Sequence, residues 1–173
     1  MPQTKQWSKT PLMSIDPLKK YTAILHTDKG DITIQLYADK TPVTVNSFVF
    51  LARSGWYDNI TFHRVIPGYV AQTGDPSGTG MGGPGYLFVD EIVDNLKFDK
   101  PGVVGMANSG KDTNGSQFFI TYDAQPDLDG QFTIFGQVIK GIEILSLLTP
   151  RHPGKDQNLQ PGDKLISIRI SEK

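Results

Sequence analysis

The first regular part of the chain alternates between apolar and polar residues. Residues 21–26 (Tyr-Thr-Ala-Ile-Leu-His) and 31–37 (Asp-Ile-Thr-Ile-Gln-Leu-Tyr) roughly follow this alternation, and residues 27–30 (Thr-Asp-Lys-Gly) separate them. A period of two is typical of a strand with one buried face, and a short polar stretch with glycine is typical of a turn. The pattern predicts a β-hairpin that begins at Tyr21.

A helix is predicted directly after this hairpin. Its apolar residues recur at i, i+3, i+4 and i+7, which places them on one side of a helix; they are Val45, Phe48, Val49 and Ala52. Thr41 is a suitable N-cap, Pro42 suits the first helical position and Gly55 suits the exit. The stripe indicates a helix packed on a core.

Short apolar segments dominate the rest of the chain. Strands are predicted at residues 103–106, 118–121, 132–138 and 164–170, with a second helix at about 141–148 that stops before Pro150. No alternation of strands with helices is present, so an antiparallel barrel is favoured over a parallel sheet. We therefore expect one mainly β domain over residues 21–173, preceded by a polar, proline-containing N-terminal extension over residues 1–20.

Composition narrows the classes of partner. The chain has 173 residues, a formal net charge of −1, no cysteine and three histidines. A balanced charge gives no field for nucleic acid, and no apolar run approaches the roughly 18 residues of a membrane span. The histidines lack metal-ligand spacing, so neither a metal nor a cofactor is expected. A cytoplasmic location is expected, or an extracytoplasmic one if a leader has been removed.

Glycines cluster at residues 78–85 (Gly-Thr-Gly-Met-Gly-Gly-Pro-Gly). No Gly-Lys-Ser/Thr follows them, and no helical stripe succeeds them, so a phosphate-binding loop is not indicated. A tight loop whose backbone uses positive φ angles is the better interpretation.

Two stretches place amides beside apolar side chains. If residues 69–74 are extended, Val70 and Gln72 share one face of the strand. In the second stretch Gln117 and Phe119 share a face, while Phe118 points to the opposite side. One face of each strand therefore offers an amide and an apolar group together, and the other face suits a core.

The motifs around these stretches resemble the cyclophilin peptidyl-prolyl isomerases. They are Phe-His-Arg-Val-Ile-Pro-Gly at 62–68, Gln72, Gly-Asp at 74–75, Gly-Thr-Gly at 78–80, Met-Ala-Asn at 106–108, Asn-Gly-Ser-Gln-Phe-Phe at 114–119 and Leu-Asp-Gly at 128–130. The similarity covers about residues 21–173, and Gly-Pro-Gly-Tyr at 83–86 is similar to the compact bacterial members. The resemblance implies a closed eight-stranded antiparallel barrel capped by two α-helices, with the substrate groove on its outer surface.

The resemblance also implies peptidyl-prolyl cis-trans isomerase activity and identifies the residues expected to perform it. Arg64 is the expected catalytic residue and Gln72 the residue that orients it. Asn108, Ala107 and Gln117 are expected to hold the peptide chain. The proline ring is expected to lie against Tyr69, Val70, Phe119, Leu128 and Phe132.

The residues themselves are compatible with catalysis of rotation about the peptide bond that precedes a proline. The two stretches contain no nucleophile and no phosphate cradle, which suits a reaction that breaks no covalent bond. His63 neighbours Arg64, but rotation about a peptide bond transfers no proton, so a structural role is expected for His63.

Four positions depart from the usual family pattern. Tyr69-Val70 replaces Phe-Met, Asp127 replaces an aromatic residue and Phe132 replaces a histidine. The aromatic residue commonly contributes to cyclosporin binding in the family, so we expect weak cyclosporin binding. Proline-containing peptides and unfolded or folded client proteins are the expected partners, and a monomer is implied.

Two other functions compete with an active isomerase. One is a low-activity binding module or chaperone of the same fold that recognises proline-containing segments. The other is a barrel of the lipocalin type with a ligand inside it. The interior is expected to be filled by Phe118, Ile120 and Ile134, which disfavours the second.

Overall fold

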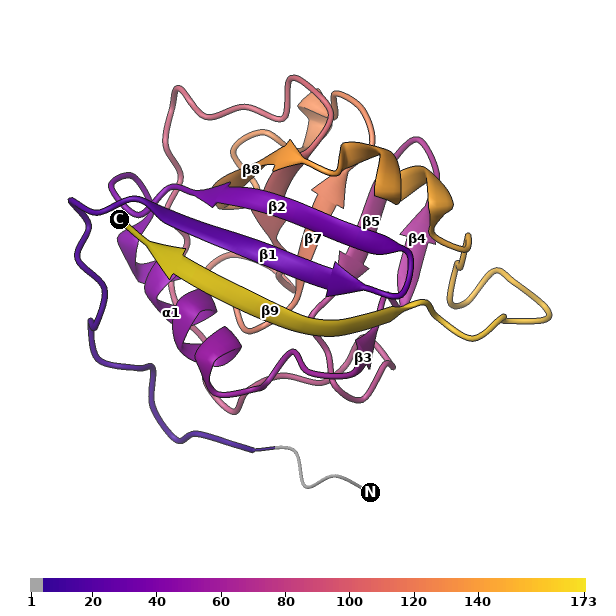
Figure 1. The fold of residues 1–173 in the computed structure, drawn as a ribbon, viewed down its shortest axis with the longest axis horizontal. Helices are drawn as coiled ribbons and strands as arrows, with labels where there is room; N and C mark the ends of the chain where they lie inside the picture. The colour runs from indigo at the N-terminus through magenta and orange to yellow at the C-terminus, as the bar shows by residue number, and fades with distance from the viewer. Residues whose placement is uncertain (1–4) are drawn as a thin grey trace.

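A computed structural model describes residues 5–173. The chain forms one curled sheet with an α-helix at one end (Figure 1). Its elements are β1 (Tyr21–Thr27), β2 (Gly30–Leu36), α1 (Pro42–Arg53), β3 (Ile60–Thr61), β4 (Arg64–Ile66), β5 (Val70–Thr73), β6 (Val103–Met106), β7 (Phe118–Thr121), η1 (Pro126–Leu128), β8 (Ile134–Lys140), η2 (Ile142–Leu147) and β9 (Lys164–Glu172). The mainly β class is confirmed, and so are the hairpin and the bounds of residues 103–106 and 118–121.

The sheet has nine strands rather than eight. Their order is β3-β9-β1-β2-β8-β6-β7-β5-β4, and every pairing is antiparallel. The two outermost strands, β3 and β4, are consecutive in the chain and are separated only by Phe62 and His63. One segment of the chain therefore contributes both ends of the sheet.

The N-terminus of α1 is satisfied by a distant carboxylate. Thr41 occupies the N-cap position, but its hydroxyl donates to the carbonyl of Tyr37 and does not cap the helix. Instead the Glu91 carboxylate accepts hydrogen bonds from the N–H groups of Val43 and Thr44, at 3.2 and 2.7 Å. A negative charge is favourable at this end of a helix. The prediction that the Thr41 side chain caps α1 was therefore wrong.

The second predicted helix is present at the expected place but is a 3-10 helix. η2 spans six residues, begins after Gly141 in a left-handed conformation and is followed by Pro150. A segment this short between a turn and a proline cannot extend into several α-helical turns, and short helical pieces commonly adopt the tighter 3-10 form. α1 is thus the only α-helix within residues 5–173.

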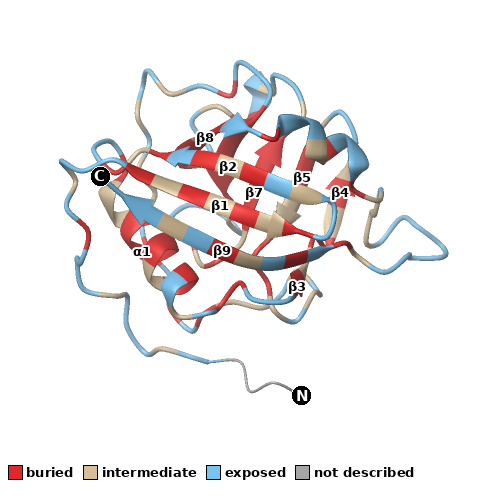
Figure 2. Cartoon of the chain, viewed as in Figure 1, coloured by how far each residue is buried: buried red, intermediate tan, exposed pale blue. Residues whose placement is uncertain are grey.

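Side chains from β5 to β8 are divided between two apolar clusters. Phe118, Ile120 and Phe135 belong to the larger cluster, which packs between the sheet and α1. Phe119 and Ile134, their neighbours in sequence, belong to a second cluster on the other face. The same alternation gives β1 its buried and half-buried residues (Figure 2). The expectation that Ile134 helps to fill the barrel interior was therefore wrong.

The larger cluster is dense in aromatic side chains. The ring of Phe48, from α1, lies 5.3 Å from each of the rings of Phe118 and Phe135 and 5.4 Å from the ring of Tyr57. All four are fully buried. These side chains occupy the space where a lipocalin-type barrel would hold its ligand.

Residues 5–20 run along the outside of α1 before they enter β1 (Figure 1). They form no helix or strand, but Ile15 is buried in the larger cluster and Trp7 packs against it. The other four residues of the predicted extension lie outside the described residues. None of the helices described between residues 5 and 173 has the length and apolar character of a membrane span.

Candidate active site

Arg64 and Gln72 begin a chain of hydrogen-bonded side chains on one face of the sheet. The two residues are opposite each other in the β4–β5 ladder, and Arg64 Nη1 donates to Gln72 Oε1 at 3.4 Å. Gln72 Nε2 donates to Gln117 Oε1 at 3.0 Å, and Gln117 Nε2 donates to the carbonyls of Gly80 and Gly82. Each amide is held in one orientation because both of its ends are used.

Tyr69 also contacts the Arg64 guanidinium. The guanidinium carbon lies 5.7 Å from the centre of the Tyr69 ring, a favourable cation–π distance. Arg64 is half-buried. The Tyr69 ring and the Gln72 amide therefore position the guanidinium, which is still partly exposed and accessible to a ligand.

Part of the second apolar cluster, here called the ring pocket after the group it is expected to hold, includes Tyr69 and so adjoins this guanidinium. Its residues are Val70, Phe119 and Leu128, which are buried, and Tyr69, Ala107 and Phe132, which are partly buried. Phe132 stands edge-on to Phe119, with their ring centres 5.5 Å apart. The structure thus brings together all of the residues predicted to hold a proline ring.

Two members of this region were missed from the sequence. Phe98 is fully buried behind the ring pocket and stacks on Phe119 at 5.6 Å. Gly105 lies on β6 against the same ring, and a Cβ added there would meet Phe119 Cζ at 2.6 Å. Phe98 belongs to no regular element, so no periodicity marked it.

Asn108 directly follows Ala107 of the ring pocket, and its side chain is already hydrogen-bonded. Its Nδ2 donates to the carbonyl of Gln131 at 3.1 Å, and its Oδ1 accepts from the N–H of Gly110 at 3.1 Å. The N–H of the neighbouring Ala107 donates to the carbonyl of Gln117. In residues 5–173 the backbone N–H and C=O of Asn108 have no hydrogen-bond partner, so both can pair with a bound chain.

Asp75 organises the glycine loop, residues 78–85. Its carboxylate is fully buried and accepts hydrogen bonds from the N–H groups of Ser77, Gly80 and Gly82. Burial alone would raise the Asp75 pKa, but the bonds from the Ser77 hydroxyl and these N–H groups outweigh it and hold that pKa below its ordinary value. Gly78, Gly80 and Gly85 have positive φ, as predicted for a tight loop.

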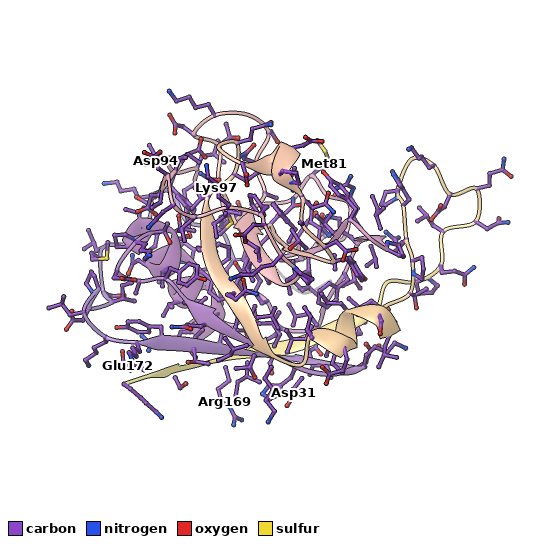
Figure 3. All side chains as sticks on the ribbon, turned by 90° about the horizontal axis from the view of Figure 1, so that it is seen from above. Asp31, Met81, Asp94, Lys97, Arg169 and Glu172 are labelled. Carbon is purple, nitrogen blue, oxygen red and sulfur yellow. The ribbon has the colours of Figure 1, made fainter. Side chains whose placement is uncertain are left out.

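The glycine loop and residues 107–109 enclose a cavity of about 480 Å³ beside Gln72 and Gln117, here called the polar groove. Met81, in this loop, lies on the side of the molecule far from Arg169 and Glu172 of β9 (Figure 3). Gln72, Ala107, Asn108 and Gln117 contribute to the groove. A chain bound along Asn108 would therefore pass from the ring pocket into the polar groove.

His63 lies beneath this surface, next to Gln117 and Gly80. Its side chain is buried, and burial lowers its pKa despite the opposing influence of Asp75. Its carbonyl accepts a hydrogen bond from Arg151 Nη1 at 2.6 Å. The ring is thus buried and neutral at pH 7, and a structural role for His63 stays a prediction.

Comparison with known proteins identifies the family. Residues 22–170 match the model of the "Cyclophilin type peptidyl-prolyl cis-trans isomerase/CLD" family. Peptidyl-prolyl cis-trans isomerase CYP18-1 of Arabidopsis thaliana is 48% identical over 151 residues, covering 85% of this chain and 91% of the relative. Peptidyl-prolyl cis-trans isomerase A of Mycobacterium tuberculosis is 45% identical over 172 residues, covering 90% and 94%.

A solved structure shares the fold. It is a cyclophilin-type isomerase of Cryptosporidium parvum crystallised in the presence of the dipeptide Ala-Pro, with a TM-score of 0.80 and 38% identity over 87% of this chain and 98% of that one. The family match spans both the Arg64–Gln72–Gln117 chain and the ring pocket. The chain belongs to the cyclophilin-type peptidyl-prolyl cis-trans isomerase family.

Proposed function

We propose that this protein accelerates rotation about Xaa–Pro peptide bonds by stabilising the twisted amide with Arg64. The observation that carries the proposal is the position of the Arg64 guanidinium, held by Gln72 and Tyr69 beside the apolar ring pocket. The expected substrates are proline-containing peptides and the unfolded or folded protein clients that contain them.

The barrier to be lowered is electronic. Rotation costs about 18–20 kcal/mol because the C–N bond has partial double-bond character. In the twisted state that character is lost, and the proline nitrogen regains a lone pair that can accept a hydrogen bond. An Arg64 N–H directed at that nitrogen pairs more strongly with the transition state than with either isomer, and such differential binding is catalysis.

Arg64 alone cannot account for a large acceleration. A factor of about 10⁵ corresponds to about 7 kcal/mol, whereas one hydrogen bond from a charged group contributes about 1.5–3 kcal/mol. The rest must come from holding the flanking chain while the bond turns. The free backbone groups of Asn108 and the Phe119 ring are the groups we assign to this task, and Gln117 Oε1 can accept one further hydrogen bond.

The ring pocket supplies the fixed end of the rotation. A proline ring against Val70, Phe119 and Leu128 is removed from water, which is favourable by roughly 25 cal/mol per Å². The related structure crystallised with Ala-Pro supports a proline ligand for this surface. With the ring held, the preceding carbonyl is the part that moves.

Other expectations belong to the same proposal. We infer that β3 and β4 act as halves of one bent strand, so that the nine-stranded sheet is equivalent to the expected closed eight-stranded barrel; chain continuity between them supports this. We expect a cytoplasmic monomer in which Asp127, exposed and charged, weakens cyclosporin binding.

Two assays test the activity. Exchange of an Ala-Pro-Phe peptide, followed by line-broadening NMR, should be accelerated by catalytic amounts of the protein. Refolding of a protein limited by prolyl isomerisation should be accelerated as well. Binding of the peptide without acceleration would instead favour a proline-binding module, with Tyr69, Asp127 and Phe132 as the responsible departures.

A further inference from the structure

Gln6 and Trp7 of the N-terminal segment meet the glycine loop, although the family match starts only at residue 22. The N–H of Trp7 donates to the carbonyl of Pro84 at 2.9 Å, and Gln6 Nε2 donates to the carbonyl of Gly83 at 2.9 Å. Two adjacent loop carbonyls are thus satisfied by two adjacent residues of the segment. Residues that precede the family match therefore lie beside the polar groove.

The segment is anchored at two further places. The Trp7 ring packs on Phe50 and Trp56, at 5.2 and 5.7 Å between ring centres. The Asn46 side chain, buried on α1, accepts hydrogen bonds from the N–H groups of Ser14 and Ile15. Its Nδ2 donates to the carbonyl of Leu12 at 3.0 Å. These contacts fix residues 7–15 along α1. Gln6 directly precedes Trp7, so the packing of the Trp7 ring also determines where Gln6 lies.

Gly85 shows that the loop is shaped for this segment. A Cβ at Gly85 would lie 2.6 Å from the carbonyl oxygen of Trp7 and 2.8 Å from Gln6 Oε1. Its φ of +95° also disfavours any other residue. The close approach of Gln6 and Trp7 therefore requires a glycine at this position.

Gln6 reaches the polar groove. It lines the same 480 Å³ cavity as Gln72, Asn108 and Gln117, and no charged side chain contributes to the lining. Within residues 5–173 no hydrogen bond involves Gln6 Oε1, so this oxygen can accept one from a bound chain. The lining as a whole offers neutral donors and acceptors, which suit a neutral polar side chain.

We propose that Gln6 is a specificity-determining residue of the isomerase, supplied to the polar groove from outside the family fold. It contacts a substrate residue that flanks the proline and favours a neutral polar side chain there, such as Ser, Thr, Asn or Gln. This inference rests on the proposed function, because it places the flanking substrate chain along Asn108.

The test compares substrate selectivity in matched variants. The measured quantity is kcat/KM for Xaa–Pro peptides that carry Gln, Gly or Lys at each of two positions on either side of the proline. At the sensitive position, Gln6→Ala should lower the Gln-to-Gly ratio about three- to tenfold, the effect of one neutral hydrogen bond. Gln6→Glu should raise the Lys-to-Gln ratio at least threefold. Gln157→Ala, at an exposed glutamine in the 152–163 loop, should leave both ratios within twofold.

A binding measurement keeps the result independent of turnover. In ¹⁵N-labelled protein the side-chain amide of Gln6 should shift when the Gln-containing peptide is titrated, and should shift less with the Gly-containing peptide. An active wild type whose ratios are unchanged in both Gln6 variants would overturn the inference alone. A wild type that accelerates no peptide would overturn the proposed function, and the Gln6 amide shift would then decide the inference separately.

Discussion

Gln72 faces Arg64 across the β4–β5 ladder and accepts the hydrogen bond that directs the guanidinium, with 3.4 Å between Nη1 and Oε1. The opposite end of the same amide is held by Gln117. Gln72 therefore acts as a positioning residue: it contributes by restricting where Arg64 points.

Gln72→Leu should lower kcat/KM about tenfold. The leucine keeps the approximate volume but removes both hydrogen bonds, so the guanidinium loses its preferred direction. Peptide exchange measured by NMR checks this, with thermal unfolding to confirm folding. Gln35→Leu, at an exposed site on β2, is the matched control. Equal activity of the two variants would remove Gln72 from the mechanism.

Gly105→Ala should deform the ring pocket from behind. The new Cβ would meet Phe119 Cζ at 2.6 Å and Phe98 Cζ at 3.0 Å. Overpacking of this kind commonly costs about 1–3 kcal/mol, and we expect weaker binding of Ala-Pro peptides as the Phe119 ring shifts. Urea unfolding and a peptide titration measure the two effects. Gly83→Ala, where no atom lies within 4 Å, is the control for stability. Unchanged stability and affinity in Gly105→Ala would contradict this prediction, because they would show that the Phe119 and Phe98 rings make room for the added Cβ without cost.

Asp75 should contribute stability that depends on pH. Its folded-state pKa lies below the ordinary value of 3.8, so its contribution is present above about pH 4 and is lost as the pH falls through the lower, folded-state pKa. Asp75→Asn should therefore lower the free energy of unfolding by about 1–3 kcal/mol at pH 7, because buried N–H donors lose their ionised acceptor. It should also reduce the loss of stability between pH 4 and pH 2. An acid limb identical to that of wild type would contradict this assignment.

Glu91→Gln should destabilise the fold by about 1 kcal/mol without a direct effect on the groove. The charge that faces the N–H groups of Val43 and Thr44 is removed, and helix N-termini favour a negative group by about this amount. Chemical denaturation measures the change. Glu143→Gln, exposed on η2, should change stability by less than about 0.5 kcal/mol. Equal effects of the two substitutions would rule out Glu91 as the helix cap.

Cyclosporin affinity should be weak and should rise in Asp127→Trp. An indole at this exposed position supplies a large apolar surface and an N–H donor at the edge of the ring pocket. Calorimetric titration should show at least tenfold tighter binding than wild type, whereas Asp123→Trp should bind as wild type does. Low-nanomolar binding by the wild type would show that Asp127 is not limiting.

Local patterns were sufficient where one element buries one face. The alternation in residues 118–121 placed Phe118 in the core and Phe119 on the site face, and the structure has them in different clusters. The helical stripe that ends at Ala52 was likewise confirmed. Such positions are readable because burial of one face imposes a period on the sequence.

Contacts between distant segments could not be read in this way. The Glu91 carboxylate reaches α1 from a loop 47 residues away, and Phe98 reaches the ring pocket from another irregular segment. Residues 5–7 show no hydrophobic periodicity, so the sequence did not predict their contact with the glycine loop. The need for glycine at position 85 is explained only by the close approach of Trp7. Sequence periodicity reports that a residue is buried, but not which distant residue buries it.

The most direct test of Arg64 catalysis is peptide exchange with Arg64→Ala and Arg64→Lys beside wild type, measured together with peptide affinity. Removing the guanidinium should slow exchange of Ala-Pro-Phe about 10- to 100-fold, the effect of one charge-assisted hydrogen bond, while the dissociation constant changes less than about threefold. Lysine should restore only part of the rate, because it cannot reproduce the planar donor geometry. Exchange at the wild-type rate in folded Arg64→Ala would contradict the mechanism.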